Sequence, residues 1–450
     1  MTKRIIYNGD IANEGKVARG YVVIDDDKIA AVGEGAPSSG LLAECDEKED
    51  VDGALVMPGV IDDQVHFRDP GLTHKADIST ESAAAVAGGV TSYMDMPNTI
   101  PPTTTLAALE AKNRRASEVS LANYGFFIGA TNENISTLQA VDYSYTPGVK
   151  LFLGASTGNM LVNERDALRA IFAEVPAIIA IHSEDEALIR RNRDFYVKKY
   201  GDELPVKFHP LIRSTEVCYK STARAVEWAE KYGTRLHVLH VSTARELELF
   251  SNAPLAQKRI TSEVCVHHLW FSDEDYARLG NLIKWNPAVK TWDDRAALRT
   301  ALERDFIDIV ATDHAPHLLS EKQGSCLKAA SGGPLVQHSL LVMLELVDKG
   351  VFTLDTVVRK MCHAPADLFG VVKRGYLREG YYADIVVVDR NVPFAVRSEN
   401  ILTKCGWSPF EGYTFRNSIR QTYVNGQLAY NQGSINSVVR GRRLKFNNSK

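Results

Sequence analysis

Several residues that can bind or work beside metal ions stand at the ends of separate apolar, strand-like runs of this chain. They are His66, Lys150, His182, His240, Asp313 and His317. Imidazoles and carboxylates are common ligands of zinc, which polarises carbonyl groups and lowers the pKa of a bound water to about 7. A metal site gathered from many strand ends is typical of a metal-dependent hydrolase built on a barrel.

Lys150 lies inside the apolar run GVKLFLG, where a charged amine is costly to bury. One interpretation is a lysine at a strand end whose ammonium reaches solvent. In the other, burial lowers the pKa of the amine, the neutral amine takes up CO2, and the resulting carbamate bridges two divalent cations. The second interpretation depends on nearby histidines, because a carbamate makes chemical sense only beside metals.

Two histidines at other strand ends can supply such metals. His182 and His240 each end an apolar run and precede a polar turn. His237 lies three residues before His240, so the two face opposite sides of a strand. We assign His240 to the centre because it is nearer the carboxyl end, and interpret His237 as a packing residue. His267 and His268 are adjacent and cannot both face the centre, so we interpret them as structural.

The segment ATDHAPH, residues 311–317, joins an apolar strand to a turn stiffened by proline. Asp313 can bind a metal through one oxygen and take a proton from water with the other. A positioned base of this kind is worth roughly 10²–10⁴ in rate.

The first strand ends in Gln64 and His66, which are two residues apart and therefore face the same side. The following turn, FRDPG, contains Arg68, whose forked cation suits a carboxylate. A surface salt bridge is the alternative role for Arg68.

Alternating strands and helices must position these residues. Helical stretches such as 77–89, 164–175, 222–233 and 293–304 separate many of the strands. Strict alternation predicts parallel pairing, and eight strands predict a closed barrel. An open doubly wound sheet also alternates, but it would not gather ligands from five such strands around one centre. The strand candidates are 56–66, 90–96, 123–129, 148–153, 177–182, 235–241, 260–266 and 307–312.

Short β elements occur near both ends of the chain, among them 382–389 and a hairpin at 420–431 with an Asn-Gly turn. The sequence therefore predicts an α/β protein with a TIM-like (β/α)8 barrel and a small β-sandwich domain built from both termini. The predicted boundaries are 1–55 plus 366–450 for the β domain and 56–365 for the barrel.

Composition narrows the class of protein. The 450 residues are 45% hydrophobic and 24% charged, with a net charge of −4, which argues against nucleic-acid or anionic-membrane partners. The sequence contains no run of about 18 apolar residues, so nothing in it suggests export or membrane insertion. The six cysteines form no CxxC pair, so we expect reduced thiols in the cytoplasm.

Seven segments in order, PGVIDDQVHFRDPG, GGVTSYMDMPNT, GVKLFLGAST, IHSED, LHVST, WNPAVK and ATDHAPH, resemble the dihydroorotases of the amidohydrolase superfamily. The similarity covers most of residues 50–390. It implies a barrel with a zinc centre of one or two ions. The implied reaction is the reversible cyclisation of N-carbamoyl-L-aspartate to L-dihydroorotate in pyrimidine biosynthesis.

The same resemblance implies a role for each site residue. His66 matches the second histidine of an HxH ligand pair, and Lys150 matches a lysine that is carboxylated in part of the family. His182 and His240 match ligands of the more exposed metal, and Asp313 matches a ligand that is also the general acid and base. The implied substrate contacts are Arg68, Asn98, Asn286, His317, Gly333 and Thr157.

Gln64 departs from the family, which usually has the first histidine of HxH at this position. An amide oxygen is a harder and weaker zinc ligand than imidazole. Three outcomes follow: Gln64 coordinates through its oxygen, the buried metal binds weakly, or the enzyme works with one metal. We expect an active enzyme in which zinc-bound hydroxide attacks the ring carbonyl and Asp313 moves the proton.

Two other classes of function remain as alternatives. Another cyclic-amide hydrolase, namely a hydantoinase, dihydropyrimidinase or allantoinase, would use the same barrel, although Arg68 with Asn98 favours a substrate that carries a carboxylate. A non-catalytic scaffold has only Gln64 in its favour. A homodimer is a reasonable expectation from barrel helices that commonly pair.

Overall fold

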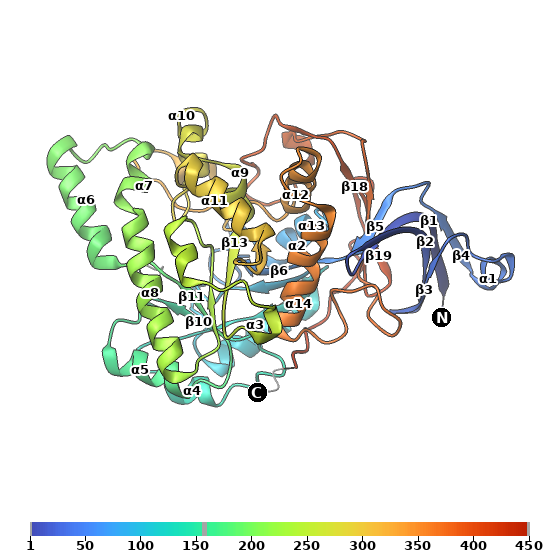
Figure 1. The fold of residues 1–450 in the computed structure, drawn as a ribbon, viewed down its shortest axis with the longest axis horizontal. Helices are drawn as coiled ribbons and strands as arrows, with labels where there is room; N and C mark the ends of the chain where they lie inside the picture. Colours follow the sequence, from blue (N-terminus) through green and yellow to red (C-terminus); the bar gives the residue numbers. More distant parts are fainter. Residues whose placement is uncertain (1, 155–159, 448–450) are drawn as a thin grey trace.

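The computed structural model describes residues 2–154 and 160–447, and its centre is a barrel of parallel strands (Figure 1). Strand β8 pairs with β7, and β9 pairs with β10. Only Phe127 separates β8 from β9, so the two act as one strand of the barrel, and the ring has eight members. The ring closes between its first and last strands, where the His66 N–H donates to the His314 carbonyl at 2.7 Å. The barrel strands are β6 (Val60–Val65), β7 (Val90–Asp95), β8 (Asn123–Phe126), β9 (Ile128–Gly129), β10 (Val149–Phe152), β11 (Ile179–His182), β12 (Leu236–Val238), β13 (Ile260–Cys265) and β14 (Ile309–Ala311).

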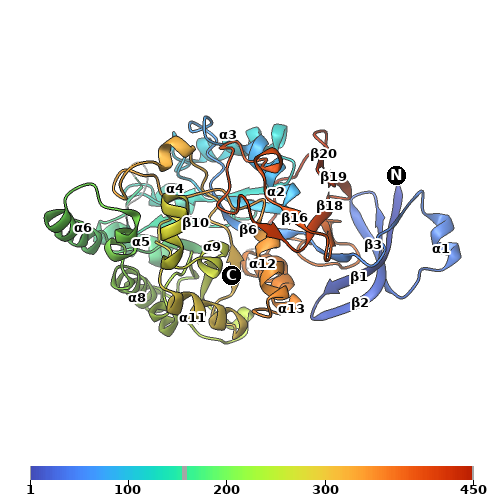
Figure 2. The same cartoon turned by 90° about the horizontal axis from the view of Figure 1, so that it is seen from above.

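Helices surround the barrel, and the two views agree that α5, α8 and α11 lie outside it (Figures 1 and 2). Polar caps start several of them: Asp77 and Thr80 form a capping box at α2. Gly233, with φ 69°, ends α8 in the left-handed conformation that glycine adopts easily. The α-helices are α2 (Ile78–Ala87), α3 (Leu106–Val119), α4 (Ile135–Gln139), α5 (Arg165–Glu174), α6 (Glu186–Tyr200), α7 (His209–Ile212), α8 (Thr215–Tyr232), α9 (Val266–Trp270), α10 (Tyr276–Leu279), α11 (Trp292–Glu303), α12 (Ser339–Asp348), α13 (Leu354–Val358) and α14 (Ala364–Phe369).

Shorter helical turns complete the connections of the barrel. Those of the 3-10 type are η1 (Val206–Phe208), η2 (Arg245–Leu249), η3 (Leu255–Gln257), η4 (Asp273–Asp275), η5 (Gly280–Ile283), η6 (Leu319–Lys322) and η8 (Ser398–Asn400), and η7 (Arg359–His363) is a π-helical turn between α13 and α14.

Both ends of the chain build one nine-stranded sheet, which confirms the predicted terminal β domain. Its strands lie at the end of the molecule opposite α6 (Figure 2). They form one continuous hydrogen-bonded sheet in the order β20-β19-β18-β15-β5-β1-β2-β3, with β4 beside β1. Its members and the nearby small elements are β1 (Lys3–Asn13), β2 (Lys16–Asp25), β3 (Lys28–Glu34), α1 (Ser39–Glu44), β4 (Glu47–Asp50), β5 (Leu55–Pro58), β15 (Ile385–Asp389), β16 (Phe394–Ala395), β17 (Thr414–Phe415), β18 (Ser418–Val424), β19 (Gln427–Asn431) and β20 (Ser434–Ile435).

Gly59 divides the apolar run 56–66 between the two sheets. β5 before it pairs with β1 and β15, whereas β6 after it begins the barrel. A Cβ at Gly59 would lie 2.0 Å from Thr91 Oγ1, so only glycine fits this close approach. The terminal sheet therefore extends to Pro58, and the predicted domain boundaries remain a prediction.

The last described residues return from the terminal sheet to the barrel. The N–H groups of Gly441 and Leu444 donate to the carbonyls of Ser120 and Tyr124, each at 2.8 Å. All six cysteines are buried and none forms a disulfide. Within residues 2–154 and 160–447, no helix has both the length and the apolar character needed to cross a membrane.

Candidate active site

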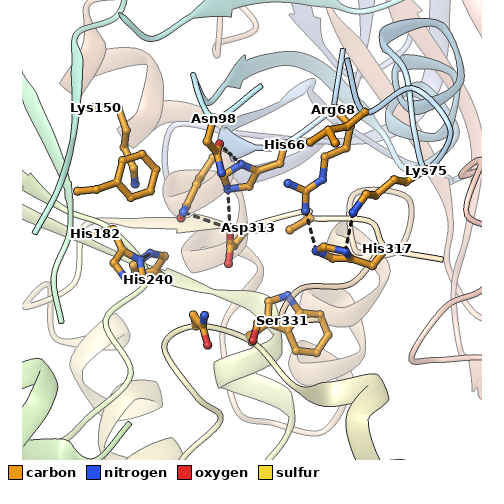
Figure 3. A pocket seen from close by; sticks show the side chains of 16 residues that line it. His66, Arg68, Lys75, Asn98, Lys150, His182, His240, Asp313, His317 and Ser331 are labelled. Carbon is orange, nitrogen blue, oxygen red and sulfur yellow. Dashed lines mark hydrogen bonds and ion pairs between the residues drawn. The ribbon is translucent and has the colours of Figure 1, made fainter. Parts of the chain in front are cut away.

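A pocket of about 170 Å³ opens where the carboxyl ends of the barrel strands meet (Figure 3). It brings together residues from all parts of the barrel sequence, between positions 64 and 331. Active sites of such barrels lie at this face because the loops there are free to vary. The lining residues are Gln64, His66, Arg68, Leu72, Lys75, Asn98, Lys150, Phe152, His182, His240, Trp285, Asn286, Asp313, Ala315, His317 and Ser331.

Three lining residues adopt left-handed backbone conformations that side chains other than glycine seldom occupy. The φ angles are 66° at Arg68, 41° at His240 and 48° at Asp313. Each lies just beyond the end of its strand. Strain of this kind costs of order 1–3 kcal/mol per residue and is found at functional sites, where the rest of the fold maintains it.

His66 connects the first strand of the barrel to the last. Its Nε2 lies 3.1 Å from Asp313 Oδ1, and its Nδ1 lies 2.7 Å from Asn98 Oδ1. Both partner oxygens can only accept, so a neutral ring donates to one of them and turns its lone pair toward the other. With the proton on Nδ1, the lone pair of Nε2 and the Asp313 carboxylate would face the same metal ion. Burial lowers the pKa of His66 although Asp313 opposes the shift. A neutral imidazole suits a metal ligand.

Gln64 is buried beside the same carboxylate. Its amide nitrogen donates to Asp313 Oδ1 at 3.3 Å, and its amide oxygen accepts from the Cys265 thiol at 3.7 Å. In this orientation the oxygen faces away from Asp313. Coordination by the Gln64 oxygen would require the amide to turn over, which exchanges nitrogen and oxygen with little change of shape.

Lys150 is 1% exposed and sits on β10 with its amine in the pocket. Burial lowers its pKa to about 8, while Asp313 and Glu263 oppose the shift. The amine lies 4.8 Å from the centre of the Phe152 ring. A buried amine whose pKa approaches neutrality is neutral often enough to react with CO2, which is the property that a carbamate requires.

His182 and His240 lie next to each other at the same side of the pocket as Lys150 (Figure 3). His182 Nδ1 is 3.0 Å from His240 Nε2, and His182 Nε2 is 3.0 Å from Glu184 Oε2. Arg213 pairs with Glu184. Burial would raise the pKa of Glu184, but Arg213 and His182 lower it to about 2, so Glu184 is a carboxylate that orients His182.

The opposite end of the pocket is cationic. His317 stands between Arg68, whose Nη2 is 3.2 Å from Nε2, and Lys75, whose amine is 3.1 Å from Nδ1. Burial, Arg68 and Lys75 all hold the pKa of His317 well below its usual range, so the ring is neutral. Glu321 pairs with Lys75 at 2.8 Å, which leaves the Arg68 charge to attract a carboxylate.

The structure brings together every predicted site residue except two. Thr157 lies outside the described residues. Gly333 does not line the pocket; a Cβ there would meet Trp285 and Trp407 at 2.8 and 3.0 Å. Ser331, two residues earlier, lines the pocket instead.

Sequence reasoning missed Lys75 because it lies ten residues after the end of β6, in the irregular part of the loop before α2, where no periodic pattern predicts the direction of a side chain. Strand candidate 260–266 ends at Cys265, so His267 and His268 belong to helix α9 and lie outside the pocket lining. The alternation of a strand therefore does not govern their direction, although both are buried as expected of structural residues.

The donor set fits divalent metal ions. Three imidazoles, one carboxylate and one amine converge, and the buried His240 Nδ1 has no hydrogen-bond partner within residues 2–154 and 160–447. Burial and the neighbouring His182 and Lys150 hold the pKa of His240 well below its usual range, so its ring is neutral. Neutral imidazoles and a carboxylate are the ligands that zinc prefers in hydrolytic sites.

Comparison with known proteins identifies the family. The model of the amidohydrolase family matches residues 55–429. A dihydroorotase of Pyrococcus furiosus is 30% identical over 446 residues, which cover 98% of this chain and 96% of that protein. A dihydroorotase of Methanosarcina mazei is 33% identical over 448 residues, with coverage of 96% and 94%.

Solved structures share the whole architecture. An L-hydantoinase (dihydropyrimidinase) of Arthrobacter aurescens superposes with a TM-score of 0.90 at 26% identity, covering 97% of this chain and 98% of that one. A dihydropyrimidinase of Brevibacillus agri superposes with a TM-score of 0.89 at 23% identity, covering 99% and 100%, and supports the fold alone. The chain belongs to the amidohydrolase family and is a metal-dependent cyclic amidohydrolase.

Proposed function

We propose that the chain is a dihydroorotase, which cyclises N-carbamoyl-L-aspartate to L-dihydroorotate and reverses that reaction. The observation that carries this proposal is the cationic end of the pocket, where Arg68 and Lys75 flank His317. Dihydroorotate carries a carboxylate on its ring, whereas dihydrouracil and hydantoin do not. The relatives named dihydroorotase support the same assignment.

In this proposal the metal ligands are His66, His182, His240, Asp313 and a carboxylated Lys150, with Gln64 at or beside the buried position. Zinc, when bound there, would polarise the amide carbonyl and lower the pKa of water. The remaining chemistry belongs to the protein. Asp313 takes a proton from the attacking water and gives it to the leaving nitrogen, and in the cyclising direction it accepts the proton of the amide.

Residues away from the metal ligands hold the substrate in this scheme. Arg68, Asn98 and His317 bind the carboxylate, and Asn286 contacts the ring. The Asn286 side-chain oxygen is buried without a partner in the described part of the chain, so it is available to accept from a ring N–H. Two fixed ends orient the ring so that its scissile bond faces Asp313.

A hydantoinase or dihydropyrimidinase is the second candidate, because solved structures with those names share the whole fold. Such enzymes act on rings without a carboxylate, and the Arg68 cation would then lack a partner in the substrate.

Relative rates on four rings test the assignment. We expect kcat/KM for L-dihydroorotate to exceed the values for dihydrouracil, hydantoin and allantoin by at least a factor of about 100, which corresponds to roughly 3 kcal/mol and to one charge-assisted contact. A preference for dihydrouracil or hydantoin would overturn the proposal in favour of the second candidate.

Metal analysis tests the centre separately. We expect one or two zinc ions in the pocket of each wild-type protomer and a higher zinc affinity of the pocket in Gln64→His, because imidazole binds zinc more strongly than an amide. NMR after exposure to isotopically labelled bicarbonate would report a carbamate on Lys150, with Lys150→Met as control. Sedimentation of the same samples tests the proposed homodimer.

A further inference from the structure

Three ionisable side chains meet inside the barrel beneath the pocket. They are Asp63 on β6, His237 on β12 and Glu263 on β13, and each is 0% exposed. One ligand atom from each lies within 4.8 Å of the others. None of the three lines the pocket, so the cluster is separate from the proposed catalytic centre.

The hydrogen bonds of His237 fix which ring nitrogen faces the carboxylates. The Thr261 hydroxyl donates to the Leu236 carbonyl at 3.3 Å, so its oxygen is free to accept the proton on His237 Nδ1, which lies 2.9 Å away. His237 Nε2 then faces the two carboxylates. A histidine whose far nitrogen donates to a protein oxygen is the usual arrangement around a bound metal.

Two distances inside the cluster match those between neighbouring ligands of one metal ion. His237 Nε2 lies 3.4 Å from Asp63 Oδ2 and 3.4 Å from Glu263 Oε2. Hydrogen bonds between an imidazolium and a carboxylate are shorter, about 2.7–2.9 Å. Ligands held at about 2.0–2.1 Å in a tetrahedron around zinc stand about 3.3–3.4 Å apart.

One polar contact offsets the burial of Asp63, the ion pair of its Oδ2 with His237 Nε2 at 3.4 Å. Neither of its carboxylate oxygens has a hydrogen-bond partner in residues 2–154 and 160–447. Glu263 differs, because its Oε1 accepts from the His240 backbone at 3.0 Å and leaves Oε2 for the cluster. Without a metal, Asp63 and Glu263 raise the pKa of His237 to about 9, so the ring holds a proton between the two carboxylates. A divalent cation bound by Nε2 would replace that proton and balance both carboxylates.

We propose that Asp63, His237 and Glu263 form a structural binding site for a divalent cation of the zinc type, in addition to the catalytic centre. The cation is taken up as the barrel folds, since the closed interior admits it only before the strands pack. It fixes Glu263, which in turn holds the strained backbone of His240. His237, predicted from the sequence to be a packing residue, also packs edge-on against Phe369, with ring centres 5.7 Å apart.

Anomalous diffraction at the zinc edge tests the site directly, with crystals of wild-type protein produced in medium that contains zinc. We expect a peak between the three side chains, separate from any peak in the pocket. Peaks in the pocket alone, or hydrogen bonds of ordinary length closing the cluster, would show that His237 is an imidazolium clamped by two carboxylates. This readout uses no substrate, so it is independent of the proposed dihydroorotase activity.

Metal content gives a second measurement. We expect Asp63→Leu to contain one zinc fewer per protomer than wild type, and added zinc not to restore it. Glu246→Gln is the matched control, because Glu246 is also buried but is satisfied by Thr222 and Thr243 at 2.9 and 2.8 Å. An unchanged zinc count in soluble Asp63→Leu would overturn the proposal. Should that variant fail to fold, the diffraction experiment decides alone.

Discussion

Two histidines at opposite ends of one pocket experience opposite surroundings. The His182 Nε2–H donates to the Glu184 carboxylate at 3.0 Å, and Arg213 pairs with the same carboxylate. His317 instead meets cations at both ring nitrogens, Arg68 at 3.2 Å and Lys75 at 3.1 Å, while Glu321 lies farther away, 3.4 Å from Nδ1. The side chains are 6% and 14% exposed, so burial alone does not separate them.

The difference shows how the same side chain acquires two functions. A carboxylate behind an imidazole increases its basicity and its affinity for a metal ion. Cations on both sides of His317 keep its ring neutral. The neutral ring lies beside Arg68, where both can contact an anionic substrate. We therefore expect changes at the His182 end to affect turnover and stability, and changes at the His317 end to affect substrate binding.

The largest effect should come from Asp313, which lies between the two ends. Asp313→Ala should lower kcat by roughly 10²–10⁴ or more, because it removes a base and a metal ligand together. Circular dichroism should show an intact fold. Asp194→Ala, which changes an exposed aspartate with a side chain 61% exposed, is the control. Near-normal turnover in Asp313→Ala would contradict its role.

Glu184 tests the carboxylate side of the comparison through acid stability. Its folded pKa of about 2 is below the value of an unfolded glutamate, so its contribution is present above about pH 4.5 and is lost as the pH falls toward 2. The pKa difference corresponds to about 3 kcal/mol. We expect Glu184→Gln to flatten the dependence of unfolding free energy on pH in this window, measured by denaturant titration.

The control for that experiment is Glu216→Gln, which removes an exposed pair with Arg245 and should change little. If the unfolding free energy of Glu184→Gln depended on pH as steeply as that of wild type, the loss of stability in acid would not come from Glu184.

Arg68 tests the cationic side. Arg68→Met should raise KM for dihydroorotate by about 10–100-fold with a smaller change in kcat, because a charge-assisted hydrogen bond contributes about 1.5–3 kcal/mol. Arg115→Met is the matched control for Arg68→Met, because Arg115 also pairs with an aspartate, Asp69, but its side chain is 46% exposed. Steady-state kinetics that show an unchanged KM and a lower melting temperature would make Arg68 structural.

Lys75 should give the smallest effect, because Glu321 already neutralises it at 2.8 Å. We expect Lys75→Met to raise KM by less than about tenfold, and Lys75→Arg to restore most of the loss. Lys404→Met, which breaks an exposed pair with Asp77, is the control. A larger rise in KM than that of Arg68→Met would mean that Lys75 is the principal carboxylate ligand.

The barrel could be predicted from the sequence because its strands are short apolar runs, each followed by polar residues. All eight strand candidates contain an observed strand. The run 56–66 shows the limit of this signal. Both β5 and β6 are buried, and only their pairing partners, β1 and β15 for β5 and β7 for β6, show that they belong to different sheets.

Site residues at strand ends could be predicted for the same reason, as His182 and Asp313 show. Lys75 and Glu184 could not, because their functions depend on partners far along the chain, His317 and Arg213. The position of Asp63 could not be predicted either. A strand directs Asp63 and its neighbour Gln64 to opposite faces, and the local sequence does not show that Asp63 faces the buried His237 and Glu263.

The bond between the His66 N–H and the His314 carbonyl joins the first barrel strand to the last. During synthesis, His66 leaves the ribosome about 250 residues before Asp313, so the ligand set is incomplete for most of translation. Fragments that end before this point would expose apolar strands and hold metal poorly. Catalytic competence is thus a property that the nascent chain gains late and in one step, when its final barrel strand arrives.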